Sequence, residues 1–166
     1  PTFVVPKVVL PETGARIRAL NDPSRKMSKS QSETRGNAVR HTDEPDEIRR
    51  TFQRAVTDTG REIIFSEVPE KAGVNNLLEI YELLTGRSRP EIEAHFEGQG
   101  YAVLKDQVAE VVIEALRPIR ERYLELVSGR SELDAILADG AMRARAVTDP
   151  KIELVKRKVG FVSLEA

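Results

Sequence analysis

The stretch that decides the fold class runs from residue 103 to residue 127 and reads VLKDQVAEVVIEALRPIRERYLELV. From Leu104 to Val127, apolar residues recur at spacings of three and four, which is the pattern of an amphipathic α-helix. Pro118 should kink this helix, because proline lacks the backbone N–H that a helix interior uses. The stretch therefore predicts the longest helix of a mainly α protein.

Upstream of this stretch, shorter helices are predicted. Apolar residues follow helical spacing from about Pro45, and again from Leu77 until Gly86 ends the pattern. Ser88 and Glu91 have the spacing of a capping box and predict the start of a short helix.

Downstream, Ser131 indicates the start of a further helix. Gly140 and Pro150 argue against one unbroken rod there, because both residues are unfavourable inside helices. Antiparallel helices with short connections predict a helical bundle.

Composition limits the possible functions of the 166 residues. Apolar residues make up 40% and aromatic residues only 5%, which predicts an aliphatic core and favours helices. The net charge of -1 provides no global field for a polyanion, so contacts to nucleic acid would need a local basic cluster. No cysteine is present, which excludes disulfides and thiolate chemistry, and no apolar run approaches the ~20 residues that span a bilayer. A cytoplasmic location is compatible with these features.

The first 42 residues differ from the rest. Residues 3–5, 8–10 and 15–20 predict a few short strands, which could be stable only at the edge of a sheet formed mainly elsewhere. Residues 21–42 are polar and predict a loop. We expect the chain to be a piece of a longer polypeptide, with a domain division after residue 42.

Residues 26–30 read KMSKS and follow the turn-forming pair Asp22-Pro23. Lysine ammonium groups are compact, mobile charges, and serine hydroxyls add hydrogen-bond donors, so the segment suits a polyphosphate. Lys26 and Lys29 can close on one triphosphate if the loop curls, and they would offset charge on a departing pyrophosphate. The alternative is a solvated linker rich in lysine and serine.

KMSKS is a signature of class I aminoacyl-tRNA synthetases, and nearly the whole chain resembles the C-terminal half of the bacterial tryptophanyl-tRNA synthetases. The stretches that carry the resemblance are GARI at 14–17, DP at 22–23, KMSKS at 26–30, AVTD at 55–58, GVNNLLEIY at 73–81, EGQGY at 97–101 and VIEALRPI at 112–119.

The resemblance implies roles for particular residues. The implied ATP-site residues are Ile17, whose backbone would lie against the adenine, and Lys26, Met27, Ser28, Lys29 and Ser30 in the loop. Of these, Lys26 and Lys29 would face the phosphates as the catalytic residues, with ATP bound as its Mg²⁺ complex. Residues 1–42 would be the C-terminal edge of a Rossmann-type catalytic domain, and residues 43–166 a helical domain that contacts the tRNA anticodon.

The implied reaction is ATP-dependent activation of tryptophan to the adenylate and its transfer to tRNA(Trp), by a homodimer. A second signature of the class, His-x-Gly-His, is absent, since the only histidines are His41 and His95. This chain alone should therefore hold half an ATP site and no tryptophan pocket, and should be inactive by itself. Two alternatives stay open: a stand-alone RNA-binding or regulatory module, and the equivalent part of a tyrosyl-tRNA synthetase.

Several other residues have simpler interpretations. Two histidines without cysteine make a metal site improbable. Asn75-Asn76 is explained equally well by capping and packing or by a contact with the catalytic domain. Tyr81 and Tyr123 are expected in the core.

The arginines of residues 117–122 and the basic residues 156–158 could touch tRNA phosphates. Because glutamates interleave the arginines at helical spacing, a salt-bridged surface is the favoured interpretation.

Overall fold

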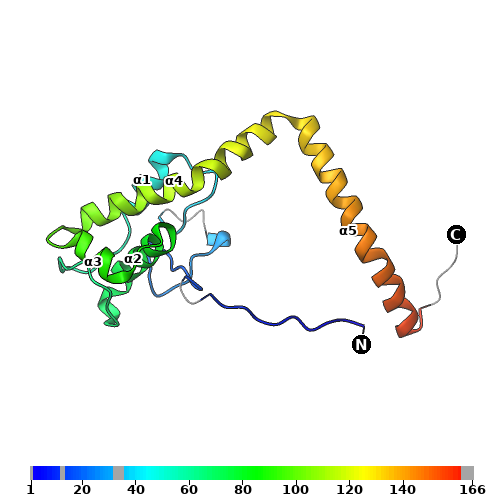
Figure 1. The fold of residues 1–166 in the computed structure, drawn as a ribbon, viewed down its shortest axis with the longest axis horizontal. Coiled ribbons are helices and arrows are strands. Elements are labelled where there is room, and N and C mark those ends of the chain that lie inside the picture. The colour runs from blue at the N-terminus through cyan, green and yellow to red at the C-terminus, as the bar shows by residue number, and fades with distance from the viewer. Residues whose placement is uncertain (1, 12–13, 32–35, 162–166) are drawn as a thin grey trace. The chain divides into compact units, whose positions relative to one another are not determined.

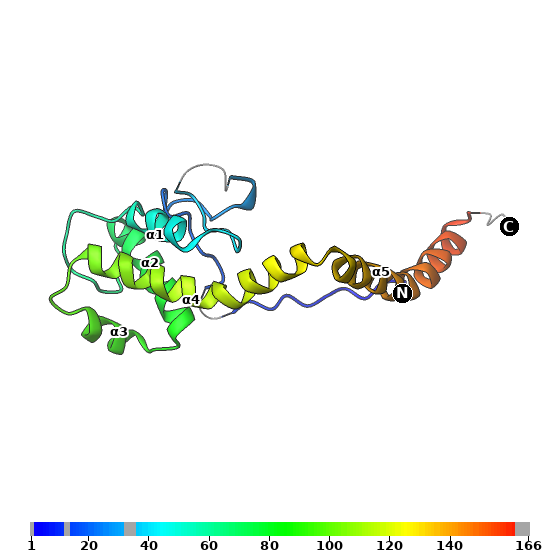
Figure 2. The same ribbon diagram turned by 90° about the horizontal axis from the view of Figure 1, so that it is seen from above.

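The structure, a computed structural model, describes residues 2–11, 14–31 and 36–161. In this part of the chain the regular elements are five α-helices and two short 3-10 helices, so the predicted mainly α class is confirmed (Figures 1 and 2). The chain divides into two compact units, one of residues 10–121 and one of residues 1–9 together with 122–166.

The larger unit holds the hydrophobic core. It contains α1 (Pro45–Gln53), α2 (Ala72–Thr85), α3 (Arg89–Phe96) and most of α4 (Tyr101–Ser128). The largest fully buried apolar side chains are Leu20, Phe52, Val74, Leu77, Leu78, Ile92, Phe96, Leu104 and Val108. The core is mainly aliphatic, as the composition predicts. Burying each such side chain contributes roughly 1.5–3 kcal/mol, so these helix faces stabilise the unit.

The end of α2 and the start of α3 lie where the sequence predicts them. α2 ends at Gly86, whose φ of 67° lies in the left-handed region that glycine adopts without strain. The predicted capping box at Ser88 and Glu91 is present at the start of α3, where the Ser88 N–H donates to the Glu91 carboxylate at 2.9 Å. A short connection therefore joins α2 to α3.

The long predicted helix is confirmed, but its burial is uneven. Among the described residues, the buried side chains of α4 lie between Leu104 and Ile113. Tyr81 is buried as predicted, but the prediction for Tyr123 is wrong, since 47% of this residue is exposed. The apolar spacing continues along α4 beyond the part of the helix that packs against α1–α3, and spacing alone does not show where that packing ends.

The predicted interruption of the last helix is wrong. α5 (Arg130–Val159) passes through both Gly140 and Pro150 without a break. A proline removes one hydrogen bond to the preceding turn, at a cost of about 3 kcal/mol, while the turns on either side keep their own bonds. In the part of α5 that the structure describes, no side chain is buried.

The strands predicted in the first 20 residues are also corrected. Residues 2–11 and 14–20 form no strand, and the only bridge in the described chain is an isolated antiparallel pair, Arg18 with Lys26. A strand needs a hydrogen-bonded ladder, and the described residues supply a single rung.

Candidate functional site

Residues 17–27 fold back on themselves and position the start of the KMSKS segment. The Ala19 N–H donates to the Arg25 carbonyl at 2.9 Å, and the Met27 N–H donates to the Ile17 carbonyl at 3.1 Å. These two bonds flank the bridge between Arg18 and Lys26. The backbone of Lys26 is thereby fixed against a segment that begins nine residues earlier.

The turn between these two arms is formed by Asp22. Its carboxylate accepts hydrogen bonds from the Ser24 N–H at 3.1 Å and from the Ser24 hydroxyl at 2.6 Å. Its carbonyl accepts from the Arg25 N–H at 3.1 Å. The bonds from Ser24 lower the pKa of Asp22 below its ordinary value. Asp22 is therefore an ionised residue whose carboxylate stabilises the turn that precedes the KMSKS loop.

The side chains of the loop point in two directions. Ile17 and Met27 are partly buried and pack against the hydrophobic core. Lys26 and Lys29 are exposed, and among the residues that the structure describes neither ammonium group has an ion-pair or hydrogen-bond partner. Met27 therefore attaches the segment to the core, while the two ammonium groups stay exposed and unpaired in the described structure.

The rest of the pentapeptide adds hydroxyl groups. Ser30 is exposed and Ser28 is half-buried, and their hydroxyls are hydrogen-bonded to each other at 2.9 Å. Lys29 opens a short 3-10 helix, η1 (Lys29–Gln31). Of the six residues predicted for the ATP site, Lys26, Met27, Ser28, Lys29 and Ser30 are consecutive in the chain. The structure adds Ile17 to them through its backbone bond to Met27.

The loop is attached to the helical core through backbone contacts. Asn76 of α2 bonds to the backbone of Arg18, and the Val56 N–H donates to the Leu20 carbonyl at 2.8 Å. Val56 in turn lies against Gly73, where an added Cβ would be 2.1 Å from the Val56 carbonyl oxygen. A glycine is required at this point, and the sequence alone gives no sign of it.

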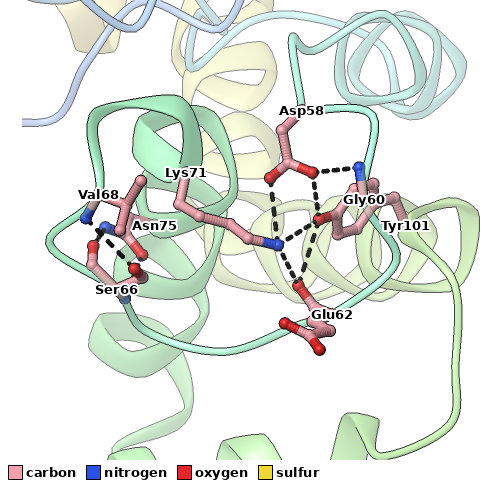
Figure 3. A network of polar contacts seen from close by, with 8 residues as sticks. All are labelled: Asp58, Gly60, Glu62, Ser66, Val68, Lys71, Asn75 and Tyr101. Carbon is pink, nitrogen blue, oxygen red and sulfur yellow. Dashed lines mark hydrogen bonds and ion pairs between the residues drawn. The ribbon is translucent and has the colours of Figure 1, made fainter.

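A second polar cluster, around Asp58, was not predicted from the sequence (Figure 3). The Lys71 ammonium lies 3.2 Å from the Asp58 carboxylate and donates to the Tyr101 hydroxyl at 2.8 Å. That hydroxyl donates to Asp58 at 2.7 Å, and Lys71 also donates to the Glu62 carbonyl at 2.9 Å. Asp58 and Tyr101 belong to the stretches AVTD and EGQGY, and only the fold shows that they meet.

The electrostatics of this cluster favour its charged form. Burial opposes ionisation of Asp58, but hydrogen bonds from Tyr101, Gly60 and Lys71 outweigh it and lower its pKa. Burial likewise opposes the charge on Lys71, but its bonds to Tyr101 and Asp58 raise its pKa. Burial, together with Asp58, raises the pKa of Tyr101. The cluster is a structural clamp: it joins the segment between α1 and α2 to the start of α4.

The arginines of α4 are engaged with carboxylates, as the salt-bridge interpretation predicts. Arg117 pairs with Glu114, Arg120 pairs with Glu44, and Arg122 pairs with both Glu125 and Glu132. These guanidinium groups are partly neutralised, so the unpaired Lys26 and Lys29 are better placed to receive an anion.

The described residues contain no group of three or more histidine, cysteine or acidic side chains arranged to hold a metal ion. Around the loop the side-chain donors are ammonium groups and hydroxyls, which suit phosphate oxygens better than a divalent cation. None of the helices in the described part of the chain has the length and apolar character needed to cross a membrane.

Comparison with known proteins defines the class. The family model described as tRNA synthetases class I (W and Y) matches residues 2–117. The chain belongs to this family of class I aminoacyl-tRNA synthetases. Among its curated relatives, the tryptophan–tRNA ligase of Wolinella succinogenes is 42% identical over 161 residues, which are 97% of this chain and 48% of that protein. The chain thus spans about half the length of the curated relatives it matches.

Two solved structures support the same relationship. The tryptophanyl-tRNA synthetase of Mycoplasma pneumoniae superposes with a TM-score of 0.74 at 25% identity, over 90% of this chain and 46% of that one. The Campylobacter jejuni enzyme, crystallised with ADP and tryptophan, superposes with a TM-score of 0.67 at 25% identity, over 96% and 48% of the two chains.

Proposed function

We propose that this chain is part of a tryptophan–tRNA ligase, to which it contributes the loop that binds the phosphates of ATP and the helices that contact the tRNA anticodon. The whole enzyme activates tryptophan to the adenylate, releases pyrophosphate and transfers tryptophan to tRNA(Trp). Residues 1–42 form the edge of its catalytic domain, residues 43–166 form its anticodon-binding domain, and the enzyme acts as a cytoplasmic homodimer.

One observation carries the proposal: Lys26 and Lys29 are exposed and lack partners in the described structure, while the partly buried Met27 between them packs against the core. An anchored segment with free ammonium groups can close on a triphosphate and offset charge on the leaving pyrophosphate. Ile17 is bonded to Met27 at the base of the loop, where the backbone of Ile17 would lie against the adenine. Mg²⁺ would arrive with the nucleotide, bound mainly by its phosphates.

A first prediction tests this role in the full-length enzyme. Lys26→Ala and Lys29→Ala should each lower the rate of tryptophan-dependent ATP–pyrophosphate exchange by about 10²-fold or more, because each removes charge stabilisation in the transition state. The dissociation constant for tryptophan should change less than twofold, since the tryptophan pocket is expected outside this chain. Arg61→Ala, which removes an exposed cation from another loop, serves as the control.

Normal exchange in both lysine variants would overturn the assignment of the loop. The family description covers enzymes for both tryptophan and tyrosine. Exchange with tyrosine in place of tryptophan would therefore favour the tyrosyl-tRNA synthetase alternative. Binding of RNA without any amino-acid-dependent exchange would favour the stand-alone RNA-binding module.

A further inference from the structure

We propose that Asn76 is a positioning residue for adenylate formation: it fixes the distance between α2 and the phosphate loop. The inference rests on the proposed function, and it assigns to Asn76 a role beyond helix capping or packing.

Asn76 bonds both polar backbone groups of one residue. Its side-chain oxygen accepts from the Arg18 N–H at 2.8 Å, and its side-chain nitrogen donates to the Arg18 carbonyl at 3.0 Å. Only 2% of Asn76 is exposed, so water cannot replace either bond without rearrangement. The amide thus takes the place that a neighbouring strand would have along this edge of the segment.

The opposite edge of the same segment holds the loop. The residues on each side of Arg18, Ile17 and Ala19, bond to Met27 and Arg25 respectively. In an extended segment, backbone groups of successive residues point to opposite edges. Arg18 therefore faces α2, while its neighbours face the arm that enters KMSKS. Any movement of Arg18 relative to α2 is passed directly to the backbone of Lys26 and Met27.

The side chain of Arg18 strengthens this connection. Its guanidinium donates to the Pro23 carbonyl at 3.0 Å, within the turn that joins the two arms. Arg18 is thus tied to α2 through its backbone and to the turn through its side chain. The buried amide of Asn76 is the link from the side chains of α2 to this segment, beside the backbone bond of Val56 to Leu20. Misplacement of a catalytic group by about 1 Å can cost roughly 10²-fold in rate.

The neighbouring residue provides a matched control. Asn75 makes the same kind of clamp, accepting from the Ser66 N–H at 3.0 Å and donating to the Ser66 carbonyl (Figure 3). Ser66 lies in the segment between α1 and α2 and is not connected by hydrogen bonds to KMSKS in the described structure. Loss of the Asn75 clamp should therefore reduce stability without moving the loop.

The test uses the full-length enzyme that contains this segment, with the variants Asn76→Ala, Asn75→Ala and Lys29→Ala. We expect Asn76→Ala to lower kcat for ATP–pyrophosphate exchange, or to raise the KM for ATP, by tenfold or more. The KM for tryptophan should stay within twofold of the wild type. Asn75→Ala should keep both kcat for exchange and the KM for ATP within twofold of the wild type. Its Tm should nevertheless fall by about as much as the Tm of Asn76→Ala.

The outcomes separate the two claims. If Lys29→Ala abolishes exchange but Asn76→Ala behaves like Asn75→Ala, the positioning role is wrong and the proposed function stands. If Lys29→Ala leaves exchange normal, the proposed function itself fails. Should Asn76→Ala not fold, Asn76→Asp keeps an acceptor for the Arg18 N–H. Asn76→Asp should then show a smaller decrease in kcat or a smaller increase in the KM for ATP. Values equal to those of the wild type would overturn the inference.

Discussion

Gly73 sets how closely the start of α2 approaches the backbone that carries the loop. An added Cβ would lie 2.1 Å from the carbonyl oxygen of Val56 and 3.4 Å from the ring of Pro23. The first of these contacts is with backbone, which cannot rotate away as a flexible side chain can. Val56 also bonds to Leu20, so the strain would spread to the segment that leads into the KMSKS loop.

A second prediction follows for this residue. Gly73→Ala should destabilise the chain by about 1–3 kcal/mol, because the new methyl group forces the backbone at Val56 to shift. Gly140→Ala is the matched control: that glycine also lies in a helix, but nothing is within 4 Å of its added Cβ. The control should be neutral or stabilising by up to about 1 kcal/mol. Urea denaturation followed by circular dichroism measures the free energy of unfolding of both variants. The prediction is contradicted if Gly73→Ala is as stable as Gly140→Ala.

At the scale of elements, the cluster of Asp58, Lys71 and Tyr101 joins the irregular segment between α1 and α2 to the first residue of α4 (Figure 3). This segment has no regular hydrogen-bonded structure from residue 61 to residue 68. Its position therefore depends on side-chain contacts, among them those of this cluster, of Asn75 with Ser66, and of Glu93 with the Phe65 N–H.

A third prediction concerns pH. The pKa of Asp58 is lowered from its ordinary value of 3.8, so its contribution to stability is present above that pH and is lost as pH falls through the lower folded value. The pKa values of Lys71 and Tyr101 are raised, so stability should also fall as pH rises above about 10. Asp58→Asn should cost about 1–3 kcal/mol at neutral pH and flatten the acid side of the curve. Urea denaturation midpoints of the wild type and of Asp58→Asn, measured as a function of pH, test this prediction. If the two plots of midpoint against pH are parallel, the prediction is contradicted.

At the scale of the whole molecule, the two units differ in how much they bury. In the larger unit, α2 buries seven of its residues, including Leu77, Leu78 and Tyr81. The described part of α5 buries none, and apolar side chains such as Leu137 and Val147 are 60% and 74% exposed. The stability of a helix in a protein comes mainly from packing of its apolar face, so the two helices should not be equally stable.

A fourth prediction is that hydrogen exchange distinguishes the units in the 166-residue chain. Amides of α2 should exchange only through global unfolding, whereas those of α5 should exchange through local opening at a much lower free energy. Native-state exchange followed by mass spectrometry on peptides from each helix measures this. Equal protection of α5 and α2 would show that α5 has a stabilising contact which the described structure lacks.

Much of the fold could be predicted from the sequence, because a helix is indicated by the spacing of residues that are close together in the chain. The apolar spacing in residues 103–127 predicted α4, and Ser88 with Glu91 predicted the start of α3. Burial was harder to predict: Tyr81 and Tyr123 both lie at apolar positions of helical patterns, but only Tyr81 has neighbours that cover it. Pro150 likewise indicated a break that the rest of α5 does not make.

The candidate site also has one part that the sequence predicts and another that only the structure reveals. KMSKS is a short continuous motif, so the sequence by itself determined which lysines and serines we propose as phosphate ligands. Only the tertiary structure decided what holds them in place. Asn76 acts on Arg18 across 58 residues of chain, and Asp58 meets Tyr101 across 43. Such contacts have no fixed spacing, because they depend on how the helices pack, and a hydrogen bond reaches only between groups that packing has already brought together.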